Sequence, residues 1–338
     1  MRQTTIGLLF LVALGLPASV VAGDKVTLKL GTLAPDGSSW HQLLKEMAAE
    51  WAQASGGTVV VKIYAGGVAG NEGDMARKLR IGQLQAAAIS AVGLADIYTG
   101  PQAISCPGLI ADDEEWKYVF PRATPAWERV MEQKGYVVLM WGDTGWVHLF
   151  LKNPVRSPAE LAGLKVFAWA GDPSSTAAFE LAGFQPVVLS ATDILPSLST
   201  GMIVGFSATP AMALGARWYE SAPHMTSTAW GHLPGATIVS RAAWEKIPEA
   251  TRARLLEIAG VYSVRVNDEV TRMQTDAIAA MKKNGLTVLE FDAAGRAAWQ
   301  ALCERTWPAV RGGVVTPEDF DAVKRIRDEY RAQKAKQP

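Results

Sequence analysis

The chain has 338 residues, of which 49% are hydrophobic and 20% are charged, so it carries enough apolar material for a sizeable core. Lysine plus arginine equal aspartate plus glutamate at 33 each, which leaves no basic excess for nucleic acid and no acidic tail for a basic partner. We therefore expect a globular protein of about two domains with no nucleic-acid partner.

The N-terminus has the layout of a secretory signal peptide, which we assign to residues 1–22. Arg2 supplies positive charge, residues 6–16 form a short apolar run, and Ala22 stands before a plausible cleavage site. The apolar run is shorter than the roughly 20 residues that a membrane-spanning helix needs, although a membrane anchor is the alternative. We therefore expect a mature protein that is exported to the periplasm.

Strand and helix patterns alternate along the first part of the mature chain. The alternation predicts an α/β fold, with helices on the faces of a sheet. Ser38 and Ser39 are suited to cap the first helix, whose apolar residues recur at helical spacing. Strands are expected over 25–32, 58–64, 85–90 and 137–141, and helices over 40–54 and 73–81.

A second α/β unit begins near residue 146. Ser157 to Glu160 has the pattern of a capping box with proline at the first helical position. The longest helical stretch, 248–283, contains no internal proline and would span on the order of 50 Å, enough to bridge two lobes. Strands are expected over 164–170, 186–189 and 201–206, and helices over 174–181, 193–199 and a last one capped by Thr316.

Motifs for catalysis and metal binding are weak. None of the four histidines forms an i,i+4 pair, so zinc has no local support. The stretch 205–209 ends in Thr209 where a nucleophile elbow needs glycine. We expect no enzyme activity, no cofactor and no metal. Cys106 and Cys303 are left open as either a disulfide or two separate buried thiols.

Several long segments resemble one family. They are "LGTLAPDGSSWHQLLKEMAAEWAQASGG", "MWGDTGWVHLFLKNPVRSPAELAGLKVFAW", "LPSLSTGMIVGFSATP" and "HLPGATIVSRAAWEKIPEATRARL". In this order they resemble the DctP-like substrate-binding proteins of tripartite ATP-independent periplasmic (TRAP) transporters, over roughly residues 25–330. The resemblance implies a two-lobed α/β fold of the periplasmic binding protein type (type II-like), with crossing hinge strands and a long bridging helix. It also implies a small organic ligand enclosed between the lobes, and the small and large membrane permease subunits as partners.

The resemblance also implies a division of the chain, and we expect a monomer. Residues 1–22 are the signal peptide, 23–145 with 232–250 form lobe 1, 146–231 with 285–315 form lobe 2, 249–284 form the long helix that braces both lobes, and 316–338 form the C-terminal helix and tail.

This sequence departs from the family at the expected ligand site. Members typically carry an arginine in the "GLKIR" strand, where it forms a bidentate pair with a ligand carboxylate. The matching position here is Phe167, and the segments 145–147 and 203–208 have also become more apolar or aromatic. A carboxylate buried without a cation is costly, so we expect an apolar, aromatic or amphipathic ligand. The candidate ligand-binding residues are Phe167, Trp169, Trp146, Phe206, Ser207, Thr209, His148, Asp172, Trp40 and Glu72.

Three alternatives remain beside this hypothesis. The aromatic rings can simply pack on each other as core. A carboxylate can still be bound if Arg77, Arg80 or Arg217 replaces the family's cation, although Arg77 and Arg80 have the spacing of a solvated helix face. The protein can also be a periplasmic carrier or sensor for a hydrophobic compound without a TRAP permease.

Overall fold

The computed structural model describes residues 25–169 and 173–336, whose strands join into one mixed sheet of ten. The main path of the sheet is β2-β1-β3-β9-β4-β7-β5-β6, and β8 and β10 branch from β4. The strands are β1 (Val26–Thr32), β2 (Val59–Tyr64), β3 (Ala86–Ser90), β4 (Tyr136–Leu151), β5 (Lys165–Trp169), β6 (Gln185–Leu189), β7 (Gly205–Ala208), β8 (His224–Thr226), β9 (Gly231–Ser240) and β10 (Thr287–Leu289).

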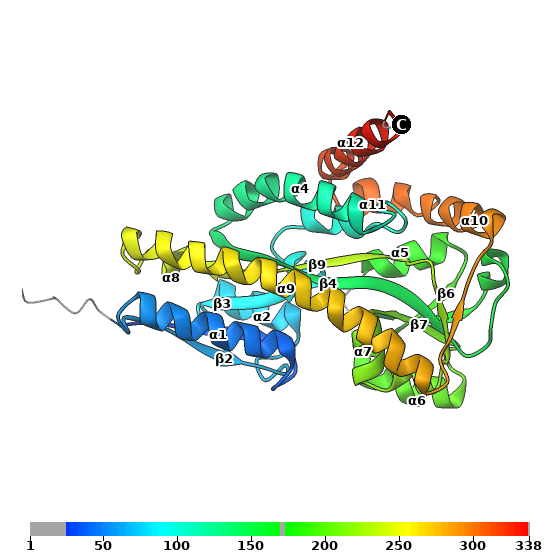
Figure 1. Cartoon of the computed structure of the whole chain (residues 1–338), viewed down its shortest axis with the longest axis horizontal. Coiled ribbons are helices and arrows are strands. Elements are labelled where there is room, and N and C mark those ends of the chain that lie inside the picture. Colours follow the sequence, from blue (N-terminus) through cyan, green and yellow to red (C-terminus); the bar gives the residue numbers. More distant parts are fainter. Residues whose placement is uncertain (1–24, 170–172, 337–338) are drawn as a thin grey trace, which may run out of the picture.

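Helices cover the sheet, and this layered arrangement confirms the expected α/β class (Figure 1). The long helix α9 lies along the whole molecule, while shorter helices follow individual strands. The helices are α1 (Ser39–Ala54), α2 (Glu72–Arg80), α3 (Ala91–Leu94), α4 (Asp113–Gln133), α5 (Pro173–Leu181), α6 (Ile194–Thr200), α7 (Pro210–Gly215), α8 (Arg241–Trp244), α9 (Glu249–Lys283), α10 (Ala293–Glu304), α11 (Trp307–Gly313) and α12 (Pro317–Lys334).

The sheet is divided into two lobes that long strands connect. Lobe 1 contains the parallel strands β1, β2 and β3, and lobe 2 contains the parallel strands β5, β6 and β7. Strand β4 pairs with β9 in lobe 1 and continues into lobe 2, where its last residues pair with β7. Since β4 runs in the direction of the lobe 1 strands and opposite to those of lobe 2, the carboxyl ends of both sets point toward the middle of the molecule.

The lobes are held together by apolar side chains at the spacing that the sequence predicts. Helix α1 buries Leu44, Met47 and Trp51 against the lobe 1 strands, and the Ser38 hydroxyl accepts a hydrogen bond from His41 N at its start. The opposite face of lobe 1 is covered by α2 and α4. In lobe 2, α5 and α10 pack on one face of the strands, and α6 and α7 pack on the other.

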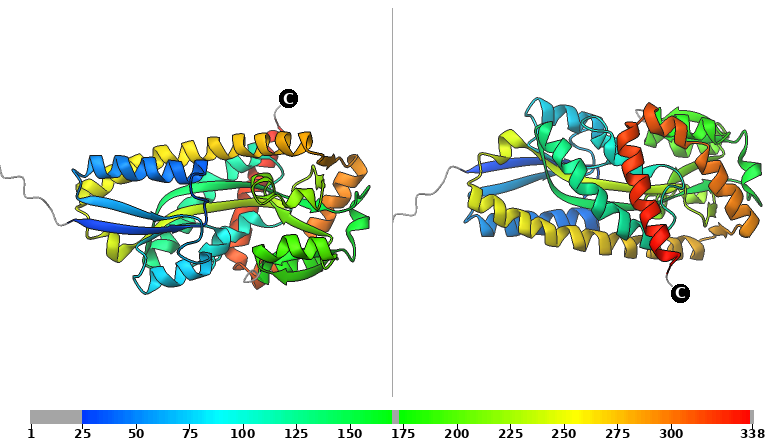
Figure 2. Two further views of the ribbon diagram at one scale, coloured as in Figure 1. Left: turned by 90° about the horizontal axis from the view of Figure 1, so that it is seen from below. Right: turned by 90° about the horizontal axis from the view of Figure 1, so that it is seen from above.

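Helix α9 has 35 residues and contributes to the cores of both lobes. Leu255, Ile258 and Val266 lie in the core of lobe 1, whereas Met281 lies in that of lobe 2. At 1.5 Å per residue the helix is about 50 Å long. It ends at Lys283, and Gly285, two residues further on, has a positive φ of 98° that favours glycine. Because its residues lie in both cores, a single helix contacts both lobes (Figure 2).

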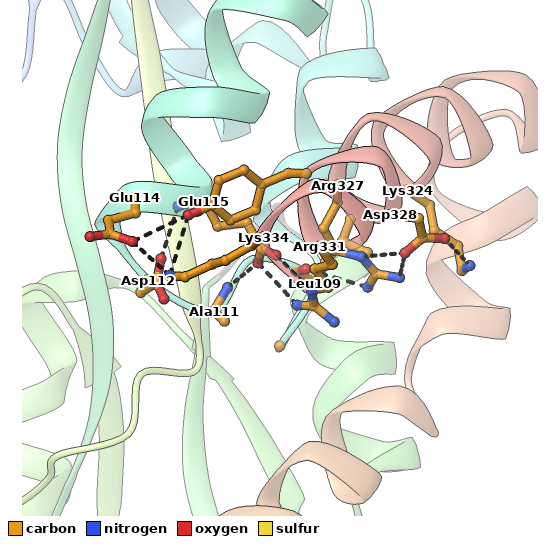
Figure 3. A network of polar contacts seen from close by, with 12 residues as sticks. Leu109, Ala111, Asp112, Glu114, Glu115, Lys324, Arg327, Asp328, Arg331 and Lys334 are labelled. Carbon is orange, nitrogen blue, oxygen red and sulfur yellow. Dashed lines mark hydrogen bonds and ion pairs between the residues drawn. The ribbon is translucent and has the colours of Figure 1, made fainter. Parts of the chain in front are cut away.

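The C-terminal helix α12 returns to lobe 1, where it lies against α4 across the middle of the molecule (Figure 2). Glu115 of α4 is buried and accepts hydrogen bonds from Arg331 Nε at 2.6 Å and from Ala111 N at 2.7 Å (Figure 3). The buried Arg327 donates to Asp328 and lies over the Trp307 ring. These charged contacts fix the end of the described chain to the start of α4.

Some elements differ from the expected ones. The residues after Ser157 form a single 3₁₀ turn, Pro158–Leu161, and the Ser157 side chain makes no capping hydrogen bond, so the expected capping box is wrong. Gly201 ends α6 in the left-handed region, and β7 therefore begins at Gly205, later than expected. The sequence analysis does not anticipate α4, because Pro121 and Pro125 lie within it and proline disfavours helix interiors.

Two further expectations concern the chain ends and the cysteines. Cys106 and Cys303 are both free and buried, which is the alternative of two separate thiols. Residues 1–22, the expected signal peptide, lie outside the described residues. Within the described residues no helix combines the length and the apolar character that crossing a membrane requires.

Candidate functional site

The middle of the molecule is the natural place for a ligand, because the carboxyl ends of the parallel strands in both lobes point there. Ligands of open α/β sheets bind beyond the carboxyl ends of strands. From lobe 1 this brings Ser90, at the end of β3, toward the middle. From lobe 2 it brings Trp169, at the end of β5, and Thr209, directly after β7.

The aromatic residues of lobe 2 form one stacked group. Phe167 and Trp169 contact each other edge to face, with ring centroids 5.0 Å apart, as expected for two side chains on one face of a strand. Phe206 stacks on Phe150 at 4.9 Å. Phe167, Phe206 and Phe150 each have 0% exposure, and α6 covers the same cluster with Ile194. Their rings are therefore core in this structure, and Trp169 is the half-exposed member of the group.

The described polar candidates of lobe 2 are buried, and Thr209 and His148 make hydrogen bonds within their own lobe. The Thr209 hydroxyl accepts a hydrogen bond from Met212 N at 3.4 Å and caps α7. His148 Nδ1 lies 2.8 Å from the carbonyl oxygen of Thr226, and burial lowers the pKa of His148. Ser207 is buried on β7, next to Phe206. Asp172 lies outside the described residues.

The lobe 1 candidates, Glu72 and Trp40, lie apart from the lobe 2 aromatic group. The Glu72 carboxylate accepts hydrogen bonds from Ser90 N at 2.7 Å, Ser90 Oγ at 2.6 Å and Gly93 N at 3.0 Å. Burial raises the pKa of Glu72, and these hydrogen bonds oppose the rise. Trp40 lies against Gly142 of β4, where an added Cβ would come within 3.0 Å of the indole ring.

Trp146 also lies apart from Phe167, because it packs with the aromatic residues of lobe 1. Its Nε1 donates to Asp113 Oδ1 at 2.6 Å, and its ring meets the His232 ring edge to face, with centroids 4.4 Å apart. His232 in turn contacts Asp143. The sequence analysis does not anticipate Asp143 or His232 as partners, because each stands alone in the sequence, without a recognisable motif.

None of the three arginines considered as an alternative cation is buried. Arg77 pairs with Asp74 at 2.7 Å, and Arg217 pairs with Glu220 at 2.8 Å; both arginines are exposed. Arg80 is exposed and donates to a backbone oxygen of the same lobe. Among the residues from 25–169 and 173–336, the only buried lysine or arginine is Arg327 on α12.

The polar candidates near the strand ends are the Glu72 carboxylate, bonded to Ser90, and the neutral Thr209. Such a site accepts hydrogen bonds more readily than it neutralises an anion. No group of three or more histidine, cysteine, aspartate or glutamate side chains in the described part of the chain is arranged to hold a metal ion.

Comparison with known proteins identifies relatives along most of the chain. Residues 30–311 match the family described as "Bacterial extracellular solute-binding protein, family 7" (DctP). A solute-binding protein of Chromohalobacter salexigens is 25% identical over 227 residues, which cover 67% of this chain and 66% of the relative.

Solved structures share the fold. A TRAP periplasmic solute-binding protein from Desulfovibrio salexigens, with bound orotic acid, superposes with a TM-score of 0.82 at 18% identity, over 91% of this chain and 99% of that one. Another from Chromohalobacter salexigens, with bound D-glucuronate, gives a TM-score of 0.80 at 22% identity, over 89% of this chain and 99% of that one. At these identities the likeness concerns the fold, and it agrees with the two-lobed architecture derived from the strand directions.

Proposed function

This chain belongs to family 7 of the bacterial extracellular solute-binding proteins, the DctP family, and we propose that its own ligand is an apolar, aromatic or amphipathic compound and not a simple carboxylate. The family consists of solute-binding proteins of TRAP transporters, not of enzymes, and its members act in the periplasm with membrane permease subunits. In our proposal the ligand is captured between the two lobes, and the loaded protein delivers it to the small and large permease subunits.

The ligand class rests on Phe167, which stands at the position where the resemblance expects the family's arginine. The ring has 0% exposure within an aromatic and aliphatic core, so it leaves no room at that position for a cation. The nearest alternative arginines are exposed and already paired with carboxylates. A carboxylate enclosed between the lobes would thus lose its hydration without gaining a charge partner, which costs several kcal/mol.

We propose that Trp169 provides the ligand-facing ring and that Phe167 and Phe206 support it from within lobe 2. Trp169 is half-buried and is the last residue of β5. An indole ring buries about 150–250 Å² and attracts both apolar groups and cations. The proposed site is completed from lobe 1 by Trp146, Trp40 and Glu72, and from lobe 2 by His148, Ser207 and Thr209. The polar residues among them would be partners for one or two polar groups of the ligand.

A second candidate function is carboxylate binding, which the ligands of the structural neighbours favour. Orotic acid and D-glucuronate both carry a carboxylate. For this chain to bind such an acid, an arginine such as Arg217 would have to leave Glu220 and enter the region between the lobes. Breaking an exposed pair costs about 0.2–1 kcal/mol, so this candidate is energetically accessible and is decided by experiment.

The proposal includes export and a monomeric state. Residues 1–22 would be removed as a signal peptide, and mass spectrometry of the periplasmic protein should find an N-terminus at Gly23. Permease genes beside this one would support coupling to a TRAP transporter. Their absence would favour the alternative of a carrier or sensor that works without a permease.

The ligand class is tested by native mass spectrometry of protein purified from its own periplasm, followed by identification of any released small molecule. We expect an apolar or amphipathic compound, and we expect Trp169→Ala to lose it. Arg217→Ala is the matched control, because it removes an exposed cation without touching the aromatic group. Retention of D-glucuronate or another simple acid, with loss of binding in Arg217→Ala, would establish the second candidate instead.

A further inference from the structure

The loop that joins β1 to α1, residues 33–38, follows the carboxyl end of β1 and therefore faces the middle of the molecule. Its backbone is tied to the next loop of lobe 1, because Gly66 N donates to Ala34 O at 2.8 Å. Gly37 has a φ of 79°, a conformation that favours glycine. A change in this loop alters the lobe 1 side of the central region and the start of α1, where Trp40 stands.

One ring nitrogen of His41, on the first turn of α1, has two partners of opposite character. His41 Nδ1 accepts a hydrogen bond from Gly37 N at 3.0 Å. The same nitrogen lies 3.0 Å from Asp36 Oδ1. The N–H of Gly37 needs a lone pair on Nδ1, whereas the carboxylate needs a proton there. A single state of the ring therefore satisfies one partner and not the other.

The protonation of the imidazole decides between these partners. A neutral ring leaves Nδ1 free to accept from Gly37 when its one proton is on Nε2. A protonated ring has an N–H on both nitrogens, so Nδ1 can only donate, and Asp36 is the acceptor beside it.

The helix holds the ring while the loop is free to respond. The His41 side chain is only 9% exposed, and His41 N donates to the Ser38 hydroxyl at 3.3 Å, which fixes the backbone of this turn. The Asp36 side chain is 89% exposed. The loop can therefore change its contacts with the ring without any movement of α1.

Other charged groups lie on α1 and on the two elements that pack against it, α9 and β2. Arg265 of α9 pairs with Glu46 of α1 at 2.6 Å, and Arg272 pairs with Glu269 within α9 at 2.5 Å. In the described part of the chain, Asp36 is the carboxylate that pairs with the His41 ring. The charged or titratable groups near the start of α1 are Lys45 and Glu46 on α1, Arg265, Asp268, Glu269 and Arg272 on α9, and Lys62 and Tyr64 on β2.

We infer that His41 is a pH-sensitive switch of the loop 33–38. With the ring neutral, Nδ1 accepts from Gly37 N and the loop keeps the arrangement described above. A proton taken up from solvent places an N–H on Nδ1, which donates to Asp36 and releases Gly37 N to water. The populations of the two arrangements change between about pH 5 and 8, the range in which histidine titrates. The inference does not depend on the class of ligand.

The switch is tested by NMR of protein labelled with ¹⁵N at glycine and histidine, recorded between about pH 5 and 8. Gly37→Ala identifies the Gly37 amide signal by its disappearance. We expect this signal to move with the same midpoint as the imidazole signals of His41. In Asp36→Asn both changes should occur at lower pH, because the protonated ring loses its anionic partner. In His41→Gln the Gly37 signal should no longer respond to pH.

His224→Gln is the matched control, because it removes a histidine on β8 of lobe 2 and leaves the loop unchanged. It should keep the pH response of the Gly37 signal, and loss of the response would assign it to another group and overturn the inference. A Gly37 signal that stays constant while His41 titrates would refute the switch, as would a His41 ring that does not titrate in this range. An unchanged midpoint in Asp36→Asn would refute the role of Asp36. Asp36 is exposed, so this variant decides even where His41→Gln does not fold.

Discussion

Phe167→Arg introduces an arginine at the position where the resemblance expects one, and we expect it to unfold lobe 2 instead of creating an acid-binding site. The Phe167 ring has 0% exposure and contacts Trp169 and the side chains of α6. Deleting a buried phenylalanine ring costs about 3–5 kcal/mol. An unpaired buried charge costs about 3–5 kcal/mol more. The sum approaches the whole stability of a typical protein, about 5–15 kcal/mol.

The assay is urea unfolding followed by circular dichroism, with two substitutions for comparison. Phe167→Leu keeps most of the apolar volume and should cost about 1–1.5 kcal/mol. Trp169→Arg places the same charge two residues further along, where the half-exposed side chain can reach water, and should cost less than Phe167→Arg. A loss below about 2 kcal/mol for Phe167→Arg would refute the reasoning, because the guanidinium must then reach the space between the lobes.

Three further results are expected. Glu115→Gln should lower the free energy of unfolding by about 2 kcal/mol in urea titrations, because it removes the charge-assisted hydrogen bonds from Arg331; a change below about 0.5 kcal/mol would contradict this. Burial lowers the pKa of His148 below 6.5 in the folded protein, so the unfolded chain binds more protons than the folded one as the pH falls. The free energy of unfolding should therefore decrease below pH 6.5, with a slope of at most about 1.4 kcal/mol per pH unit. His148→Gln should show a shallower fall in calorimetry, and an identical pH profile would exclude His148 as its source. Burial raises the pKa of Cys303 to about 12 and that of Cys106 as well, so Ellman's reagent should react with neither thiol in the native protein and with both after denaturation; no reactive thiols after denaturation would reveal a disulfide.

The sequence predicts the regular elements well where local spacing determines them. The apolar residues of α1 and the absence of an internal proline from 248–283 place both helices within one or two residues of their observed bounds. The hinge strand is different, because the residues Gly142 to Gly145 resemble a loop while long-range pairing with β9 makes them part of β4. The local sequence pattern does not reveal that pairing between β4 and β9.

The candidate site is predictable only in part for a similar reason. Alternation along β5 correctly puts Phe167 and Trp169 on one face of the strand. Whether that face meets core or open space depends on α6, which follows later in the chain and covers Phe167 with Ile194 and Leu198. The contact between Asp143 and His232 likewise joins two strands that are distant in sequence, so it follows from the topology of the sheet and not from a motif.

The return of the chain to lobe 1 has a consequence for the order in which the molecule folds. Strand β9 occupies the place between β3 and β4, so the first half of an emerging chain has a gap in the middle of its sheet. The strands of lobe 2 can pair before that gap is filled. The buried Glu115 receives its guanidinium only when the chain has been made as far as Arg331, and a chain that ends shortly before that residue would leave the Glu115 carboxylate buried without its partner. The N-terminal half can therefore reach its final structure only after the last helix has formed.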